Sequence, residues 1–576
     1  MHTSLASKSD LHVHSKHSDR PSEWFLRRIG SPESFADPSE IYRNAQQRGM
    51  DFVTITDHNT IRGALEIGHL KGTFLSSEIT TYFPEDGCKI HILVLGINES
   101  QFRMIQELRA DIYQLQRYLA DEDVIASVAH PLYRVNGRLT IDHVEKLLLM
   151  FHRFEEINGM RDRRASDLIR AVFRNLTPDL IARMADRHGI DPAGSEPWRK
   201  CFTGGSDDHS GVHVGTAHTA TPYAKDANEF LSHLRRGEHE AAGGCGGSVM
   251  MGHSVYHIAY CYYKDRFVRG NGKPTILGEL FKKLLEQSTE PPKPAGLGSR
   301  IRGLATGIVW GRRMQGASEL ERTLVKDISA LFSTADSRDA ASPLLDERRT
   351  FHYACQISHS LGYSFVGRFL ELIRQGRFLE SLHTVAAVGP VALSMAPYLA
   401  AFSAQHKDEG FLNAVAAHFA PSVACPRGAR RKAWITDTFA EVNGVSRTIQ
   451  AVAAVAKRLR RPLTVLTSLD NVPATTADVK NFTPVGTFPM PEYESQPIAF
   501  PPFLEVIEYI ERHRFTELTI STPGPMGLTG LAAARLLGLR TTGIYHTDFV
   551  QYVRYLTQDD DLADLTWKYM AWFYEQ

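Results

Sequence analysis

From residue 10 to about residue 240, short apolar runs alternate with longer stretches in which apolar residues recur at helical spacing. We predict strands at the short runs 11–13, 52–56, 73–80, 89–97, 124–130, 153–159 and 200–207. The helical stretches between them include 38–50, 100–119, 140–151 and 165–173, and the first follows the start signal Asp-Pro-Ser-Glu and ends near Gly49. This alternation predicts an α/β fold with a parallel sheet, either open or closed into a barrel.

Metal-binding residue types occur at or near the ends of these predicted strands. His12 and His14 flank one apolar residue, so on a strand both side chains would point to the same face. The complete set of candidate ligands is His12, His14, Asp19, His58, Glu78, His91, His130, Asp207 and His209. In a barrel the carboxyl ends of the strands meet at one mouth, so these side chains are expected to converge there.

Imidazole with carboxylate suits zinc, manganese or iron, and nine ligands exceed what one tetrahedral ion needs. We therefore predict two or three neighbouring divalent ions. Glu78 would be the best bridge between them because a carboxylate has two oxygens to share. A multinuclear site of this kind stabilises the charge that develops in phosphate ester hydrolysis and activates a water. A single histidine beside a strand is usually structural, but nine ligand-type residues at successive strand ends favour a site.

The motifs HVHSKHSD (12–19), TDHN (56–59), AHP (129–131) and GGSDDH (204–209), with Glu78 after a strand, resemble those of the PHP (polymerase and histidinol phosphatase) family. The match covers residues 10 to about 240. The resemblance implies a distorted (βα)7 barrel over residues 1–265, with a trinuclear metal centre that hydrolyses phosphate esters. A structural metal site in a non-catalytic scaffold is disfavoured, because such a site needs only four ligands.

The resemblance also implies a division of the ligands among three ions. His12, His14, Glu78 and Asp207 would hold the first ion; Asp19, His58 and His209 the second; and His91 and His130, with Glu78 as the bridge, the third. We take Glu78, Asp207 and His209 among these ligands, together with Arg20 just after Asp19, as the catalytic candidates. Asp57 and Asp208 lie outside the ligand positions and are expected to support the ligands.

The chain departs from the family pattern after Asp19, where RPSEWFLRRIGSPESFAD (20–37) is inserted. Insertions at a barrel mouth usually shape substrate access, so we expect Arg20 to contact the substrate. An ordinary solvated loop is the alternative. Arg134 and Arg161 also follow predicted strand ends, and the guanidinium fork matches phosphate geometry, so we predict that they bind substrate.

Residues 266–425 show helical patterns without strand alternation and contain a Pro/Gly-rich linker at 286–300. We interpret this region as a helical linker or scaffold. The uncharged run 385–404 is long enough to reach across a bilayer, but it is Ala-rich and contains two prolines. A buried helical hairpin is the favoured interpretation, and peripheral docking on a membrane surface is the alternative.

Residues 426–576 twice repeat a plan of strand, Gly-containing loop, helix and strand, which predicts a Rossmann-like domain. The segments ITDTFAEVNGVSRT, STPGPMGLTGLAAARLLGL and YHTDF resemble the N-terminal, acceptor-side half of retaining GT-B glycosyltransferases. That resemblance implies that Asn443 and Gly444 line a cleft and that His546 approaches the transferred sugar. A sugar nucleotide or glycolipid acceptor would be the partner. The donor-binding half of that family is not among these 576 residues, so we expect that the chain is a truncated product, that a separate polypeptide supplies the donor half, or that this half has become a binding module.

Composition narrows the choice of partners and compartment. Lys+Arg and Asp+Glu both number 65, and this zero net charge argues against nucleic acid as the main partner. Six scattered cysteines without a CxxC pair and the absence of a leader-like apolar segment favour a cytoplasmic protein, with contact at the inner membrane face left open. The leading hypothesis is a metal-dependent phosphoesterase acting on a small phosphorylated substrate. The alternative is a glycosyltransferase in which the barrel is accessory.

Overall fold

The computed structural model describes residues 5–21, 24–263, 265, 347–374, 388–421, 431–441, 443–472, 475, 477–490 and 493–576. The chain divides into two compact units. Unit 1 comprises Met1–Glu286 with Ala400–Pro426, and unit 2 comprises Gln287–Leu399 with Arg427–Gln576. This division differs from the predicted boundaries 1–265, 266–425 and 426–576, because part of the predicted middle region belongs to each unit. The predicted linker 286–300 lies outside the described residues.

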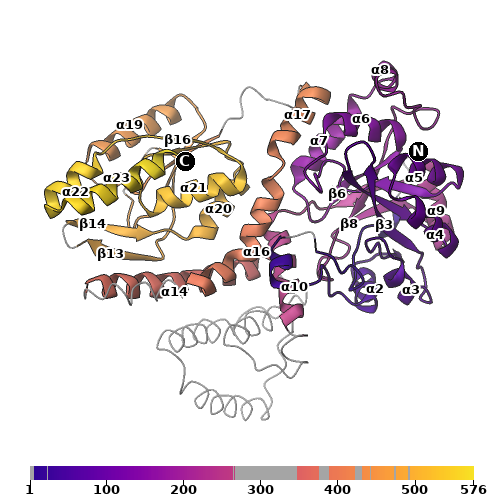
Figure 1. The fold of residues 1–576 in the computed structure, drawn as a ribbon, viewed down its shortest axis with the longest axis horizontal. Helices are drawn as coiled ribbons and strands as arrows, with labels where there is room; N and C mark the ends of the chain where they lie inside the picture. The colour runs from indigo at the N-terminus through magenta and orange to yellow at the C-terminus, as the bar shows by residue number, and fades with distance from the viewer. Residues whose placement is uncertain are drawn as a thin grey trace, which may run out of the picture. The chain divides into compact units, whose positions relative to one another are not determined.

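Unit 1 has a mixed α/β architecture with strands at its centre and helices outside them (Figure 1). Its strands are β1 (Leu5–Asp10), β2 (Phe52–Val53), β3 (Ser76–Phe83), β4 (Cys88–Leu95), β5 (Ile125–Val128), β6 (Arg153–Asn158), β7 (Cys201–Gly205), β8 (Ala217–Pro222) and β9 (Glu240–Gly243). They form two sheets in the orders β2-β1-β8-β9 and β3-β4-β5-β6-β7. Isolated parallel bridges join the sheets, Val53 to Thr73 and His58 to Glu78 on one side, and Val13 to Asp208 on the other.

The expectation of a purely parallel sheet is wrong for β4, which is antiparallel to both β3 and β5. Only the four residues 84–87 separate β3 from β4, and Gly87 has a positive φ of 69°. Parallel neighbours need a crossover of a dozen residues or more, so a turn this short can only make a hairpin. The strands β5, β6 and β7 pair in parallel, as expected.

The first strand also lies earlier than predicted, at Leu5–Asp10 rather than 11–13. Its sequence LASKSD is polar, so its periodicity does not stand out. Asp10 is nevertheless buried and accepts hydrogen bonds from the backbone of Ser206 and Gly215. His12 and His14 therefore follow the carboxyl end of β1 instead of standing on a strand, while Val13 between them bridges to Asp208.

The helices of unit 1 cover the sheets and enclose its apolar cores. They are α1 (Trp24–Ile29), α2 (Pro38–Gln47), α3 (Arg62–Ile67), α4 (Glu99–Leu108), α5 (Ile112–Asp121), α6 (Ile141–Met150), α7 (Arg163–Arg174), α8 (Pro178–His188), α9 (Ala227–Arg236) and α10 (Ser248–Tyr263). The stretch 100–119, predicted as one helix, is divided because Asp111 caps the start of α5 with its side chain. The largest core that the described residues of unit 1 form lies between β3–β6 and α4–α8 and includes Ile92, Leu148 and Phe154.

A segment far along the sequence returns to complete this core. Helix α16 spans Val388–His406, and its residues from Ala400 onward belong to unit 1 with α17 (Glu409–Phe419). Val415 and Phe419 of α17 are buried in the largest core. Because this segment is helical and apolar on one face, its packing against α6 and α7 explains why part of the predicted middle region joins the N-terminal residues.

Unit 2 contains a five-stranded parallel sheet in the order β12-β11-β10-β15-β16 and a hairpin of β13 and β14. Its strands are β10 (Lys432–Ile435), β11 (Leu463–Thr467), β12 (Val479–Asn481), β13 (Gly486–Met490), β14 (Tyr493–Phe500), β15 (Glu517–Ile520) and β16 (Arg540–Gly543). The two predicted strand–helix–strand repeats are present as β10–α19–β11 and β15–α21–β16. The strand order reverses between β10 and β15, which is where doubly wound sheets bind ligands.

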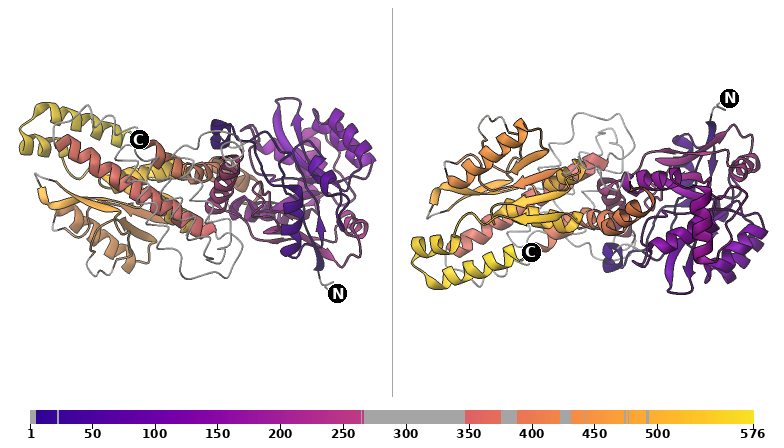
Figure 2. Two further views of the ribbon diagram at one scale, coloured as in Figure 1. Left: turned by 90° about the horizontal axis from the view of Figure 1, so that it is seen from below. Right: turned by 90° about the horizontal axis from the view of Figure 1, so that it is seen from above.

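The helices of unit 2 are α14 (Glu347–Arg374), the first part of α16, α19 (Gly444–Arg458), α20 (Phe503–Arg512), α21 (Pro525–Leu537), α22 (Phe549–Thr557) and α23 (Asp560–Tyr574). Figure 2 shows α19 on one face of the parallel sheet and α21 with α23 on the other. Within the described residues, no helix has the length and apolar character required to cross a membrane. The run 385–404 falls mostly within the single helix α16, which contains Pro397.

Candidate metal centre

Glu78 lies at the centre of the histidine cluster and is completely buried. Its Oε2 atom is 3.2 Å from Nε2 of both His12 and His14 and 3.0 Å from Nδ1 of His58. Its Oε1 atom is 2.7 Å from His91 Nδ1 and 3.1 Å from His130 Nε2. One carboxylate thus faces five imidazoles, three through one oxygen and two through the other.

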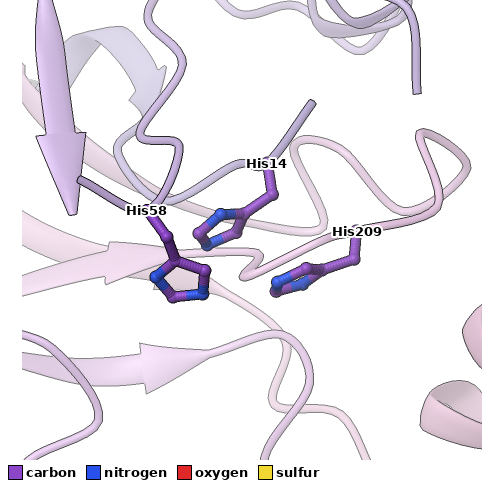
Figure 3. Close-up of side chains that lie close together, drawn as sticks. All are labelled: His14, His58 and His209. Atoms are coloured by element: carbon purple, nitrogen blue, oxygen red, sulfur yellow. The ribbon is translucent and has the colours of Figure 1, made fainter. Parts of the chain in front are cut away.

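Asp207 is the second carboxylate of the cluster. Its Oδ1 atom lies 3.4 Å from His12 Nε2, 3.6 Å from His14 Nε2 and 3.7 Å from His209 Nδ1. The rings of His14, His58 and His209 point toward one another, as Figure 3 shows, and those of His14 and His209 stack with centroids 4.0 Å apart. Eight of the nine predicted ligands are therefore brought together in one cluster.

Hydrogen bonds on the outer side of the cluster orient three of the rings. His12 Nδ1 lies 2.8 Å from Glu155 Oε1, and His14 Nδ1 lies 3.1 Å from Ser18 Oγ. His209 Nδ1 lies 3.0 Å from the carbonyl oxygen of Asp207. When Nδ1 is held this way, the tautomer leaves Nε2 free to bind a metal. Glu155 also accepts the backbone N–H of His130, so it holds two members of the set.

Asp57 and Asp208 bind loops rather than joining the cluster, which agrees with their expected supporting role. Asp57 accepts the backbone N–H and the hydroxyl of Ser15, together with the hydroxyl of Ser18. Asp208 accepts the backbone N–H groups of Ser210 and His213. Both residues thereby fix the loops that carry the histidines.

The donor set fits divalent cations. Among the described residues, several buried ring nitrogens that face the centre have no hydrogen-bond partner, and Glu78 Oε2 has none either. The nitrogens in question belong to His12, His14, His58, His91 and His209. A buried polar atom without a hydrogen-bond partner destabilises the fold unless a ligand, such as a metal ion, binds it. The cluster contains four overlapping groups of three residues, and within each group the three ligand atoms lie within 4.8 Å of one another. Four such groups suit more than one ion.

In the metal-free protein, the protonation states of Glu78, His14 and His91 suit metal binding, whereas His58 would have to release a proton to bind an ion. Burial lowers the pKa of His91 to about 3, and burial with two neighbouring imidazoles holds the pKa of His14 well below its ordinary value. Burial opposes ionisation of Glu78, but the surrounding histidines outweigh it and hold its pKa well below the usual range. For His58, burial is outweighed by carboxylates led by Glu78, which raise its pKa to about 9. Neutral imidazoles and ionised carboxylates are the forms that bind metals.

Two members of the cluster have left-handed backbone conformations, His130 with φ of 30° and Asp207 with φ of 54°. Such conformations cost roughly 1–3 kcal/mol in residues other than glycine and accumulate at functional sites. Close packing under the cluster adds to this constraint. An added Cβ at Gly205 would lie 2.3 Å from His12 Cβ, so the backbone of β7 approaches His12 as closely as a glycine allows.

The inserted segment 20–37 and the residue before it differ from the expectation that Asp19 binds a metal. Asp19 and Arg20 are exposed, and Asp19 is absent from the close ligand groups of the described residues. Glu33, which lies in the insertion and was not among the predicted ligands, is 4% exposed. Its Oε2 atom is 3.4 Å from His58 Nε2, and its Oε1 atom is 3.8 Å from His209 Nε2. The sequence around Glu33, SPESF, has no motif that would mark this residue as a metal ligand.

Arg134 and Arg161, both predicted to bind substrate, have different surroundings. Arg134 donates from Nε to Leu139 O and also to Gly137 O, and its NH1 lies 3.9 Å from Asp408, so it ties its own loop to the returning segment. Arg161 lies over the Tyr133 ring at 3.6 Å. It also lines a pocket whose wall includes His130, Glu155, Asn158, Gln405 and Asp408. The positive charge of Arg161 helps to lower the pKa of Asp207, although His12 contributes more.

The predicted site residues of unit 2 lie beyond the carboxyl ends of its strands. Asn443 caps α19 by accepting the backbone N–H of Ser446, and an added Cβ at Gly444 would meet open space. His546 follows β16, and its Nε2 atom is 3.3 Å from Ser521 Oγ. Burial lowers the pKa of His546. Asn443 and Gly444 come after β10 in the chain, and Ser521, which His546 contacts, directly follows β15.

Comparison with known proteins gives a family match for one part of the chain. Residues 442–576 match the model of Glycosyltransferase Family 4. An uncharacterized protein from Methanocaldococcus jannaschii is 40% identical over 79 residues, which span 13% of this chain and 44% of that protein. The chain therefore spans less than half the length of this curated relative.

Two solved structures show a distant likeness. A metal-dependent phosphoesterase from Bifidobacterium adolescentis is 18% identical, with a TM-score of 0.20, over 40% of this chain and 96% of its own. An amidohydrolase from Chromobacterium violaceum is 16% identical, with a TM-score of 0.23, over the same shares. The chain thus joins an N-terminal part that resembles the PHP family in its motifs to a C-terminal part similar to Glycosyltransferase Family 4.

Proposed function

We propose that unit 1 is a metal-dependent phosphoesterase with two or three divalent ions at the histidine cluster. The observation that carries this proposal is Glu78, a single buried carboxylate that faces five imidazoles. In the same proposal, strands β1–β7 form a distorted seven-stranded barrel. The bridges at His58–Glu78 and Val13–Asp208, on opposite sides of the two sheets, support this arrangement.

The residues divide into those that hold the ions and those that hold the substrate. His12, His14, Glu78 and Asp207 would hold one ion, His58 and His209 a second, and His91 and His130 a third with Glu78 as the bridge. When bound, such ions supply Lewis-acid stabilisation of a phosphate and lower the pKa of a water. The chain itself orients the ligands through Glu155 and Ser18 and excludes solvent around Glu78.

The pocket beside His130 is the proposed binding place of a small phosphorylated substrate. Two arginines line it, Arg161 and Arg164, and Arg164 is paired with Asp162 and Glu409. Arg161 would therefore bind the phosphate, and stacking on Tyr133 fixes the plane of its guanidinium. A planar guanidinium can bind two phosphate oxygens at once. Gln405 and Asp408 from the returning segment complete the wall, so both ends of the unit 1 sequence contribute to the pocket. Arg134 has a structural role in this proposal.

The proposal is tested by elemental analysis of the purified protein, followed by assays on a panel of phosphomonoesters and phosphodiesters. We expect at least two ions per chain and turnover that is lost in Asp207→Ala and His14→Ala. A protein that binds no divalent metal, or that binds metal but hydrolyses no member of a broad panel, would contradict the proposal. Arg161→Ala is expected to raise KM while leaving the metal content unchanged.

A second candidate function is sugar-nucleotide or glycolipid binding by unit 2, which the Glycosyltransferase Family 4 match favours. The N-terminus of α21 is not available for a phosphate, since the half-buried Asp437 accepts the backbone N–H groups of Met526 and Gly527 there. A ligand would instead lie near Gly444 and His546. Calorimetric titration with UDP- and GDP-sugars tests this candidate, and binding that survives His546→Ala and Gly444→Val unchanged would contradict the placement.

A further inference from the structure

We propose that Glu33, from the inserted segment 20–37, is a metal ligand that takes the place expected of Asp19. With His58 and His209 it would complete the second metal position. This inference rests on the proposed metal-dependent function and specifies one ligand of that centre. It changes the role of the insertion, which would then provide part of the metal centre instead of only shaping access to it.

The position of the Glu33 carboxylate carries the proposal. Ligand atoms of His14, His58 and His209 lie within 4.8 Å of one another. Glu33 adds two oxygens at the edge of this group, 3.4 Å from His58 Nε2 and 3.8 Å from His209 Nε2. Two ligands that each lie about 2.1 Å from one tetrahedral ion are about 3.4 Å apart, so these separations suit a shared ion better than a direct hydrogen bond.

The backbone of the insertion holds Glu33 in this position. The Ser34 N–H donates to the carbonyl oxygen of Ser18 at 3.3 Å, and the Lys16 N–H donates to that of Ala36 at 2.8 Å. The Ser34 hydroxyl also donates to the carbonyl oxygen of His14 at 3.4 Å. These bonds attach the residues that directly follow Glu33 to the segment that carries His14. A buried carboxylate on a fixed loop loses little conformational entropy when it binds an ion.

Asp19 provides the contrast within the same loop. It precedes the insertion and is exposed, whereas Glu33 is 4% exposed. Both side chains carry a single carboxylate, so a metal position could accept either by charge. Burial and proximity to two ring nitrogens distinguish them, and both favour Glu33.

The experiment compares wild type, Glu33→Gln and Asp19→Asn, with Mn²⁺ as the probe. Each full-length protein is stripped with chelator, reloaded with Mn²⁺ and freed of excess metal, and bound manganese per chain is measured. We expect Glu33→Gln to hold one ion fewer than wild type and to show a smaller rise in Tm on adding Mn²⁺. Asp19→Asn is expected to match wild type in both measurements.

The Tm of each metal-free protein reveals a folding defect. If Glu33→Gln fails to fold, Glu33→Asp replaces it, with an expected loss of at least tenfold in Mn²⁺ affinity because the shorter side chain retracts the carboxylate. A full complement of manganese in Glu33→Gln, or loss of an ion in Asp19→Asn, would overturn the inference and leave the phosphoesterase proposal intact. A wild-type protein that binds no manganese, zinc or iron would overturn both.

Discussion

At the scale of single residues, the carboxylate of Glu78 has the largest expected effect. Its two oxygens face five histidines, so a neutral replacement weakens every proposed metal position at once. We predict that Glu78→Gln loses at least two ions per chain, as measured by elemental analysis. Retention of the wild-type metal content would show that Glu78 is not a bridge.

Glu155 is expected to act through His12 and not by binding a metal itself. It lies 2.8 Å from His12 Nδ1 and accepts the backbone N–H of His130. Loss of such an outer partner typically costs 10–100-fold in metal affinity. We predict a decrease of this size in Mn²⁺ affinity for Glu155→Gln, measured by calorimetry, with the number of ions unchanged. A lost ion would instead make Glu155 a direct ligand.

His239 should make unit 1 sensitive to acid independently of the metal centre. Burial, next to Arg153 and His152, lowers its pKa from 6.5 to about 3. As the pH falls below 6.5 the unfolded chain binds a proton here and the folded chain does not. The stabilisation is thus complete above pH 6.5 and is lost below it, by up to about 1.4 kcal/mol per pH unit.

The measurement is the Tm of chelator-treated protein at pH 7.5 and pH 5.0. We predict that the difference in Tm between the two pH values is smaller in His239→Leu than in wild type. An equal difference in both proteins would mean that His239 does not cause the acid sensitivity. Chelator treatment keeps metal release out of the comparison.

At the scale of elements, the close approach of β7 to the loop after β1 positions His12. A Cβ added at Gly205 would lie 2.3 Å from His12 Cβ and 2.8 Å from the His12 backbone nitrogen. We predict that Gly205→Ala displaces His12, lowers Tm and decreases Mn²⁺ affinity at least tenfold. Gly244→Ala is the control, because a Cβ there meets nothing within 4 Å. Equal behaviour of the two variants would contradict this role of β7.

Much of the element order of unit 1 could be predicted from sequence, because buried strands and amphipathic helices leave different hydrophobic periods. Strands β2 to β7 lie at or within a few residues of their predicted positions. The failures have physical causes. Strand β1 was missed because its sequence is polar and has no hydrophobic period. Its buried residue Asp10 is held by hydrogen bonds from backbone N–H groups instead of by apolar contacts. The four-residue turn before β4 makes a hairpin where parallel strands were expected.

The residues of the candidate site could also be predicted only in part from the sequence. Histidines that follow strands, such as His14 and His130, could be found in sequence because strand ends converge whatever the loops do. Glu78 and His91 differ from the expectation, since they lie within β3 and β4. Glu33 and Glu155 could not be found in sequence, since one depends on how an inserted loop folds back and the other on which face of β6 turns inward. Asp19 occupies the expected position in sequence, but it is exposed in space.

At the scale of the whole molecule, the stability of unit 1 depends on residues 400–426, which lie at the C-terminal end of the predicted middle region. Phe419 is 4% exposed and packs in the largest core with Val415. We predict that Phe419→Ala destabilises unit 1 by about 3–5 kcal/mol, the usual cost of truncating a buried aromatic residue. Hydrogen exchange should quicken in β5 and β6 but not in β10 and β15. Equal changes in both units would contradict the division of the chain.

The central claim is that the cluster around Glu78 hydrolyses phosphate esters with bound metal. The most direct test is the rate of phosphate release from a phosphoester panel by Mn²⁺-loaded wild type and by Glu78→Gln under the same conditions. We predict metal-dependent turnover by wild type and a loss of at least 1,000-fold in the variant, on the order of what an essential catalytic group contributes. Equal rates in the two proteins, or no turnover by wild type that holds two or more ions, would contradict the claim.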